Sequence, residues 1–215
     1  MSLRSRVIRF AAWCLRRDAF TVAGARFRAA QGVLNPTAFR SSLLFAGEAL
    51  QAAPSSGRAL EFGCGLGVAA VLLARRGLTT TAVDRDPRAV RATTDNARRN
   101  GVDVQAVLSN WDAALPEDLR FEWIVANPPF LATEQSAFKL ALHGGDRLEE
   151  VAACTRAMAR RLTQDGRGLL MTSERSGRSL VLDTLDAAEL TVTATNVRRH
   201  WGERYFFDVV QSPAT

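Results

Sequence analysis

From about residue 58, short apolar runs along the chain alternate with segments of helical spacing. Runs rich in Val, Ile, Leu and Thr that stop at Gly, Asp or Asn-Pro are typical of buried strands, and apolar residues three and four apart are typical of amphipathic helices. The predicted strands span 58–63, 79–84, 102–109, 121–126, 166–173, 190–199 and 204–212. The predicted helices after the first strand span 66–77, 86–101, 147–162 and 178–188.

This alternation of strands and helices predicts an α/β fold. Most of the strands are apolar along their whole length, so we expect a parallel sheet with helices on both faces. Only a few residues join the last two strands, which therefore should pair antiparallel. The expected architecture is a Rossmann-like, seven-stranded, mostly parallel sheet with an antiparallel last strand.

The N-terminal segment differs from the rest. Its apolar residues fall on one helical face, opposite a face rich in arginine, as in an amphipathic helix. The residues of the apolar face are Ile8, Ala11, Ala12, Leu15 and Ala19. After a loop at 33–42, a further helix is expected through "LLFAGEALQAA". We therefore predict a helical extension over residues 1–40, acting as a cap or lid, and one larger domain over residues 41–215.

Length and composition suit a single core. The chain has 215 residues and is 47% hydrophobic, enough to bury a sizeable interior. No apolar run approaches the ~20 residues of a membrane span, and the basic start lacks the apolar stretch of a secretory signal. Cys14, Cys64 and Cys154 match no zinc or disulfide spacing. We expect a cytoplasmic protein that does not associate with membranes.

The basic balance of the chain leaves its partner open. Net charge is +6, from 28 basic and 22 acidic residues, and every basic residue except Lys139 is arginine. Such a charge suits an acidic partner such as RNA. It suits equally an arginine-rich composition with a solvated surface. The charge therefore selects neither class of partner.

A glycine turn and a later acid predict a nucleoside cofactor. "LEFGCGLG" (60–67) places Gly63, Gly65 and Gly67 between the first strand and its helix. Without Cβ atoms the backbone turns sharply and a ligand can approach it closely, beside a helix N-terminus. Asp84 ends the next strand ~20 residues further on, where an acid can accept hydrogen bonds from both ribose hydroxyls.

The details of the turn favour S-adenosylmethionine (SAM) over a dinucleotide. The third glycine of the dinucleotide fingerprint would fall on Val68. Glu61 precedes the turn, and its carboxylate suits the ammonium group of SAM but would repel a pyrophosphate. A nucleotide-binding oxidoreductase is therefore the less favoured class, and a non-enzymatic SAM-binding module remains a further alternative.

Four segments together resemble a known family. "LEFGCGLG", "VDRDP", "NWDAAL" and "NPPF", in this order, are similar to the class I SAM-dependent methyltransferases, in the branch that carries N/D-P-P-Y/F. The resemblance covers about residues 33–211. With "ALHGGDRLEEV" (141–151) downstream, the chain looks most like the HemK/PrmC-type protein-glutamine methyltransferases.

The resemblance also implies roles for individual residues. It places Glu61 and the three glycines around the amino-acid part of SAM and Asp84 at the ribose. Asn110, in place of the family's usual acid, and Trp111 would lie at the adenine. The full set of cofactor-binding residues expected from these motifs is Glu61, Gly63, Cys64, Gly65, Gly67, Asp84, Arg85, Asn110, Trp111 and Asn127.

The Asn-Pro-Pro-Phe run predicts the chemistry. Two consecutive prolines make a stiff turn directly after a buried strand. An amide or base-amine nitrogen is weakly nucleophilic, and acceptors fixed beside it can orient its N–H groups and stabilise the growing positive charge. Asn127 and the Pro128 carbonyl are such acceptors, Pro129 stiffens the turn, and Phe130 would pack over a planar group. These four residues are the predicted catalytic residues of an N-methyltransferase.

The acceptor stays open between three classes. The resemblance favours a protein glutamine amide, as in enzymes that act on release factors. Phe130 replaces the tyrosine usual in those enzymes, which keeps a base amine of RNA or DNA as an alternative. A small-molecule acceptor, with the N-terminal helix as a lid, is the third. The expected product is S-adenosylhomocysteine.

Overall fold

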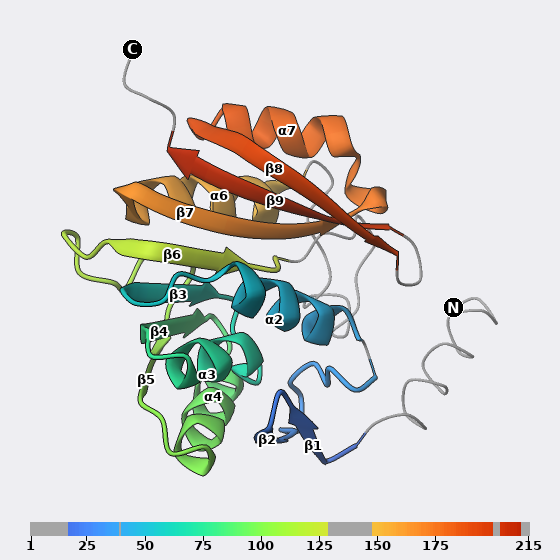
Figure 1. Cartoon of the computed structure of the whole chain (residues 1–215), viewed down its shortest axis with the longest axis vertical. Coiled ribbons are helices and arrows are strands. Elements are labelled where there is room, and N and C mark those ends of the chain that lie inside the picture. The colour runs from blue at the N-terminus through green and yellow to red at the C-terminus, as the bar shows by residue number, and fades with distance from the viewer. Residues whose placement is uncertain (1–16, 39, 129–147, 200–202, 212–215) are drawn as a thin grey trace.

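The computed structural model describes residues 17–38, 40–128, 148–199 and 203–211. These residues form a seven-stranded sheet in the order β5-β4-β3-β6-β7-β9-β8, a separate hairpin and the helices that cover the sheet (Figure 1). The strands are β1 (Ala19–Val22), β2 (Ala25–Arg28), β3 (Arg58–Phe62), β4 (Thr79–Asp84), β5 (Val104–Leu108), β6 (Phe121–Ala126), β7 (Leu162–Ser173), β8 (Leu190–Arg199) and β9 (Glu203–Gln211). The helices are α2 (Ser41–Ala52), α3 (Val68–Arg75), α4 (Pro87–Arg99), α6 (Glu149–Arg161) and α7 (Arg178–Asp186).

The predicted architecture is confirmed. Strands β5, β4, β3, β6 and β7 pair parallel, while β9 is antiparallel to both β7 and β8. Strand β7 is longer than the predicted 166–173, because it begins at Leu162 directly after α6. A register shift between Phe121 and Trp123 of β6 takes up its additional residues.

The sheet is covered on both faces. Helix α2 packs against α3 and lies in front of the sheet in Figure 1, while α6 lies behind it and contacts α7. Fully buried aromatic side chains, Phe62, Phe121 and Trp123 among them, fill the space between the layers. Because the parallel strands share one direction, their carboxyl ends meet at one edge of the sheet. No helix within the described ranges is long and apolar enough to cross a lipid bilayer.

The N-terminal prediction is wrong at Ala19, which lies in a strand. Residues 19–28 form the β1–β2 hairpin. Ala23 and Gly24 both have positive φ, 47° and 75°, as two-residue type I′ turns require. The alternation of side chains around Ala23-Gly24 in "FTVAGARF" is typical of a β-hairpin and could have predicted it. The other residues assigned to that helix face, Ile8, Ala11, Ala12 and Leu15, lie outside the described residues.

Two asparagines, Asn96 of α4 and Asn100 directly after this helix, hold the hairpin. Asn100 accepts the Arg26 N–H at 2.8 Å and donates to the Arg26 carbonyl at 2.7 Å. Asn96 makes the same pair of bonds to Arg28, at 2.9 and 3.1 Å. The two side-chain amides thus bond the free edge of β2 as a neighbouring strand would. The buried Phe27 side chain adds an apolar contact to this attachment.

Candidate active site

The glycine turn connects β3 to α3 at the carboxyl edge of the sheet. Gly63, Gly65 and Gly67 all have positive φ, at 67°, 55° and 72°, a conformation that side chains with Cβ rarely adopt. A Cβ added at Gly63 would meet no atom within 4 Å, so the turn is open there. At Gly65 it would lie 3.9 Å from Val33, so the segment after the hairpin covers this part of the turn.

Helix α4 supports the turn from behind through polar residues that the sequence analysis did not identify. A Cβ at Gly67 would lie 2.6 Å from Thr93 Cγ2, so close packing requires glycine there. The Thr93 hydroxyl donates to the buried Cys64 sulfur at 3.2 Å. Asn96 donates to the Leu66 carbonyl at 3.0 Å. Thr93 and Asn96 lie three residues apart on the buried face of α4, a pattern that could have predicted this polar contact.

Glu61 is a buried carboxyl next to the turn. It is 4% exposed, and its Oε2 accepts the Ala70 N–H in the first turn of α3 at 2.8 Å. Burial raises the pKa of this carboxyl to about 8, and the nearby charge of Asp84 adds to the rise. A cation bound beside Glu61 would favour its ionised form. The site therefore suits a positively charged ligand.

Asp84 ends β4 and is bonded to the turn. One carboxylate oxygen accepts the Gly65 N–H at 3.0 Å, and the other accepts the Asp86 N–H at 2.9 Å. Burial raises the pKa of Asp84, although both bonds act against the rise. The structure thus brings together the two features that the sequence separated by ~20 residues. Arg85, the next residue, points to α6 and pairs with Glu150 at 2.9 Å.

Asn110 and Trp111 follow β5 at the same edge. Asn110 is exposed, so its amide is accessible to a ligand. Trp111 has a positive φ of 51° and is half-buried, with its ring edge-on to Phe62 at 5.9 Å between centroids. Phe62 is the last residue of β3, so the indole lies close to the start of the glycine turn. Their role at the adenine stays a prediction.

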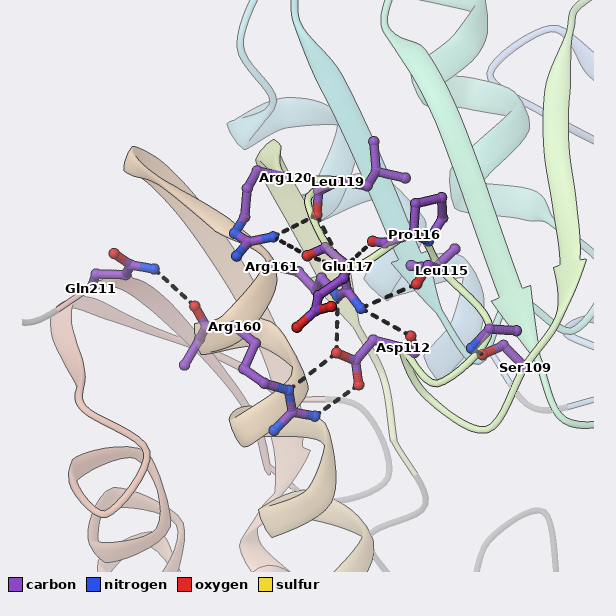
Figure 2. A network of polar contacts seen from close by, with 12 residues as sticks. Ser109, Asp112, Leu115, Pro116, Glu117, Leu119, Arg120, Arg160, Arg161 and Gln211 are labelled. Atoms are coloured by element: carbon purple, nitrogen blue, oxygen red, sulfur yellow. Dashed lines mark hydrogen bonds and ion pairs between the residues drawn. The ribbon is translucent and has the colours of Figure 1, made fainter.

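An ion-pair network fixes the segment that carries these two residues (Figure 2). Asp112 is buried and pairs with Arg160 at 2.8 Å and Arg161 at 2.9 Å, both at the end of α6. Burial alone would raise the pKa of Asp112, but the hydrogen bonds from the two guanidinium groups lower it.

Arg161 also binds the backbone of this segment. Its guanidinium donates to the carbonyls of Asp112, Leu115, Pro116, Glu117 and Leu119. One buried side chain therefore holds residues 112–119 in place. The sequence alone does not reveal this network, because Arg160 and Arg161 are 48 and 49 residues away from Asp112 in the chain.

Asn127 directly follows β6 at the same edge of the sheet, and one polar atom of its side chain lacks a described partner. The Oδ1 atom is buried and has no hydrogen-bond partner among the described residues. Pro128 is also buried. Such an acceptor is costly to leave unbonded, which is typical of a ligand site. Pro129 and Phe130, the other two predicted catalytic residues, lie outside the described residues.

The residues present fit SAM. Two acidic side chains, Glu61 and Asp84, both with raised pKa values, face a turn that is open at Gly63. Such a site suits the positive charge of a sulfonium and an ammonium group. Asp84 stands at the end of the second strand, where an acid can bond a ribose.

Solved structures of methyltransferases share this fold. The T. thermophilus 16S rRNA N2 G1207 methyltransferase, in complex with AdoMet and guanosine, superposes with a TM-score of 0.66 at 24% identity, over 91% of this chain and 50% of that one. The ribosomal protein L11 methylase from Lactobacillus delbrueckii subsp. bulgaricus superposes with a TM-score of 0.63 at 18% identity, over 81% and 79% of the two chains.

Proteins with similar sequences are also methyltransferases. The release factor glutamine methyltransferase of Cereibacter sphaeroides is 34% identical over 182 residues, which is 78% of this chain and 63% of the relative. The ribosomal protein L11 methyltransferase of Bordetella parapertussis is 44% identical over 75 residues, 34% of this chain and 23% of the relative. The chain thus spans less than two thirds of either relative.

The fold, the site and these relatives define a SAM-dependent methyltransferase. Residues 26–149 match the model of the methyltransferase small domain, which covers more than half of the chain. The chain belongs to that family.

Proposed function

We propose that this methyltransferase acts on a planar nitrogen, with Asn127 as the residue that orients the acceptor. The observation that carries the proposal is the buried Oδ1 of Asn127, which has no partner among the described residues. A buried acceptor of this kind gains most from a ligand that donates an N–H group. Glutamine amides and exocyclic base amines both carry such donors on a flat, delocalised nitrogen.

In this proposal, the cofactor-binding residues act before transfer. Glu61 would attract the ammonium group, the turn at Gly63 would admit the amino-acid part, and Asp84 would accept from the ribose. Asn110 and Trp111 would hold the adenine. SAM supplies an electrophilic methyl group on a positively charged sulfur.

Transfer follows from the position of Asn127. Its Oδ1 would accept one N–H of the acceptor, which would direct the nitrogen lone pair toward the methyl carbon. The new nitrogen–carbon bond forms as the carbon–sulfur bond breaks, and its electron pair returns to sulfur. The nitrogen then loses a proton to water. A fixed carbonyl-type oxygen beside it favours the transient positive charge.

The first acceptor we propose is a glutamine side chain of a protein. A release factor glutamine methyltransferase is 34% identical to this chain over 182 residues. An amide nitrogen also has two N–H groups, which match the Asn127 oxygen and the Pro128 carbonyl as a pair of acceptors.

A second acceptor class, an exocyclic amine of a nucleobase, is supported by different observations. The chain carries a net charge of +6, with arginine as its main basic residue. Its fold also superposes over 91% of its length on the T. thermophilus 16S rRNA N2 G1207 methyltransferase, which was solved with guanosine. A flat base amine offers the same N–H donors as an amide.

One experiment tests the proposal and separates the acceptors. The wild-type protein and Asn127→Ala are each incubated with methyl-labelled SAM and one of three acceptor fractions: a release factor, deproteinised ribosomal RNA, or the small molecules of a cell extract. Label on nitrogen in one fraction, lost with Asn127→Ala, supports the proposal. Label on oxygen, sulfur or carbon, or full transfer by Asn127→Ala, overturns it.

A further inference from the structure

A cavity lies at the β9–β8 edge of the sheet, away from the glycine turn. It measures about 590 Å³ and lies between the start of α7 and the strands β8 and β9, elements that Figure 1 labels. The described residues that line it are Arg178, Thr195, Val197, Arg199 and Tyr205. None of them belongs to the cofactor site proposed above.

Strand register shows how this cavity lies relative to the transfer site. Thr172 of β7 pairs with Tyr205 of β9, which pairs with Val197 of β8. On the other side of β7, Leu170 pairs with Ala126, the last residue of β6 before Asn127. Neighbouring strands are ~4.8 Å apart and each residue rises ~3.3 Å, so Tyr205, two strands and two residues away from Ala126, lies roughly 12 Å from the end of β6. An acceptor of more than one residue at Asn127 would reach the cavity.

The lining residues combine positive charge with a ring. Arg178 and Arg199 bring two guanidinium groups, and no acidic residue of the described part of the chain lines the cavity. Arg178 is also the first residue of α7, where a positive charge opposes the helix dipole. Helix stability therefore does not account for this arginine. Tyr205 adds a half-buried ring to the lining, with its centroid 6.3 Å from that of Phe207.

A buried hydroxyl next to Tyr205 in the sheet has no hydrogen-bond partner among the described residues. Paired residues in a sheet point to the same face, so Thr172 lies on the cavity side with Tyr205 and Val197. Thr172 is fully buried, and its Oγ1 has no hydrogen-bond partner among the described residues. Thr172 itself does not line the cavity, whose candidate ligand-binding groups are the two arginines and Tyr205.

We propose that this cavity binds a nucleotide next to the methylated one in a single-stranded nucleic acid. Arg178 and Arg199 would bind its phosphate, and its base would stack on Tyr205. Guanidinium groups match phosphate oxygens, and a ring beside a basic groove is how single-stranded nucleic acids are held without sequence preference. An acidic peptide would use the arginines but not the ring. The inference rests on the proposed transfer site and argues for the second acceptor class.

Fluorescence anisotropy with a labelled single-stranded RNA of about ten nucleotides tests the proposal. The double variant Arg178→Gln/Arg199→Gln should weaken binding about tenfold or more and lower the salt slope by about two phosphate contacts. Its matched control is Arg98→Gln/Arg99→Gln, which removes the same charge from the exposed last turn of α4 at the far side of the sheet. The control should change binding less than about twofold.

The ring is tested separately. Tyr205→Leu should weaken RNA binding about fivefold or more, while Tyr205→Phe keeps the ring and should bind as the wild type does. Three results overturn the proposal: no RNA binding by the wild type at about 50 mM salt, equal losses in the two arginine pairs, or equal competition by an oligoglutamate peptide. The transfer site is assayed separately, by methyl transfer to a free nucleoside: the double arginine variant should keep the wild-type rate there while losing RNA affinity, so failure of transfer and failure of this cavity are distinguishable.

Discussion

The backbone N–H of Gly65 donates to Asp84 Oδ2 at 3.0 Å, which ties the glycine turn to the end of the neighbouring strand. We predict that Asp84→Ala weakens binding of S-adenosylhomocysteine by ~1.5–3 kcal/mol, because a charged acceptor for the ribose and the tether of the turn are both lost. Isothermal calorimetry with the two proteins measures this loss of affinity.

The control for Asp84 lies two residues further on. Asp86 caps α4 by accepting the Arg88 N–H at 2.8 Å. Asp86→Ala should cost ~1 kcal/mol of unfolding free energy and leave cofactor affinity within about twofold. Equal affinity losses in the two variants would show that Asp84 acts only through the local fold.

Asn127→Ala should retain the fold and the cofactor but lose transfer. Its Oδ1 is buried without a described partner, so removing it should leave the melting temperature unchanged or raise it. Loss of one fixed acceptor should slow methyl transfer ~100-fold or more, about 3 kcal/mol of transition-state stabilisation. Single-turnover transfer at saturating SAM, with calorimetry and thermal melting, gives all three values. A marked drop in melting temperature would contradict the assignment.

Glu61 should make the cofactor-free protein less stable as pH rises. Its carboxyl is protonated in both states below pH 4.5, but from there to about pH 8 only the folded chain keeps the proton. The unfolded chain binds fewer protons in this window, so the unfolding free energy falls as pH rises through it. Glu61→Gln should remove this contribution and melt higher than the wild type at pH 8.

The measurement compares melting temperatures of the two proteins from pH 5 to 8.5. The gap between Glu61→Gln and the wild type should widen with pH across this range. A constant gap would mean that the Glu61 carboxyl is already ionised in the folded chain at pH 5.

Two adjacent arginines on one carboxylate should differ in their effect on stability. The Arg161 side chain is 9% exposed and also binds backbone carbonyls, whereas the Arg160 side chain is 58% exposed. Arg161→Gln should lower the unfolding free energy by ~3 kcal/mol, and Arg160→Gln by less than ~1 kcal/mol. Urea denaturation measures both, and comparable losses would contradict the role given to Arg161.

Much of the fold could be predicted because the signals are local. An apolar run such as that of β6 stops at a turn residue, and the Asp86-Pro87 pair begins α4 where predicted. The glycine turn and Asp84 were found for the same reason, since each lies at the end of a strand. The order of the strands follows from the α/β class and not from any single residue.

The misses arise where long-range contacts decide. Ala19, at the start of the hairpin, also fits the apolar face of a helix. The hairpin is held by Asn96 and Asn100, about 70 residues later, which bond Arg28 and Arg26 of β2. Arg160 and Arg161 are, in sequence, simply two basic residues in the last turn of a helix. Their partner Asp112 can be identified only after the sheet has brought β5 and α6 together.

The side chain of Asn96 bonds both the hairpin, at Arg28, and the glycine turn, at Leu66. Hairpin detachment therefore breaks the bonds from Asn96, Asn100 and Arg75 but none of the pairings within the seven-stranded sheet. Such an event is a sub-global opening, cheaper than complete unfolding. Amide hydrogen exchange at Arg26 and Arg28, whose N–H groups bond Asn100 and Asn96, reports its free energy directly. Val33 follows this hairpin and lies next to Gly65. The same exchange rate therefore reports how often the glycine turn is uncovered at Gly65.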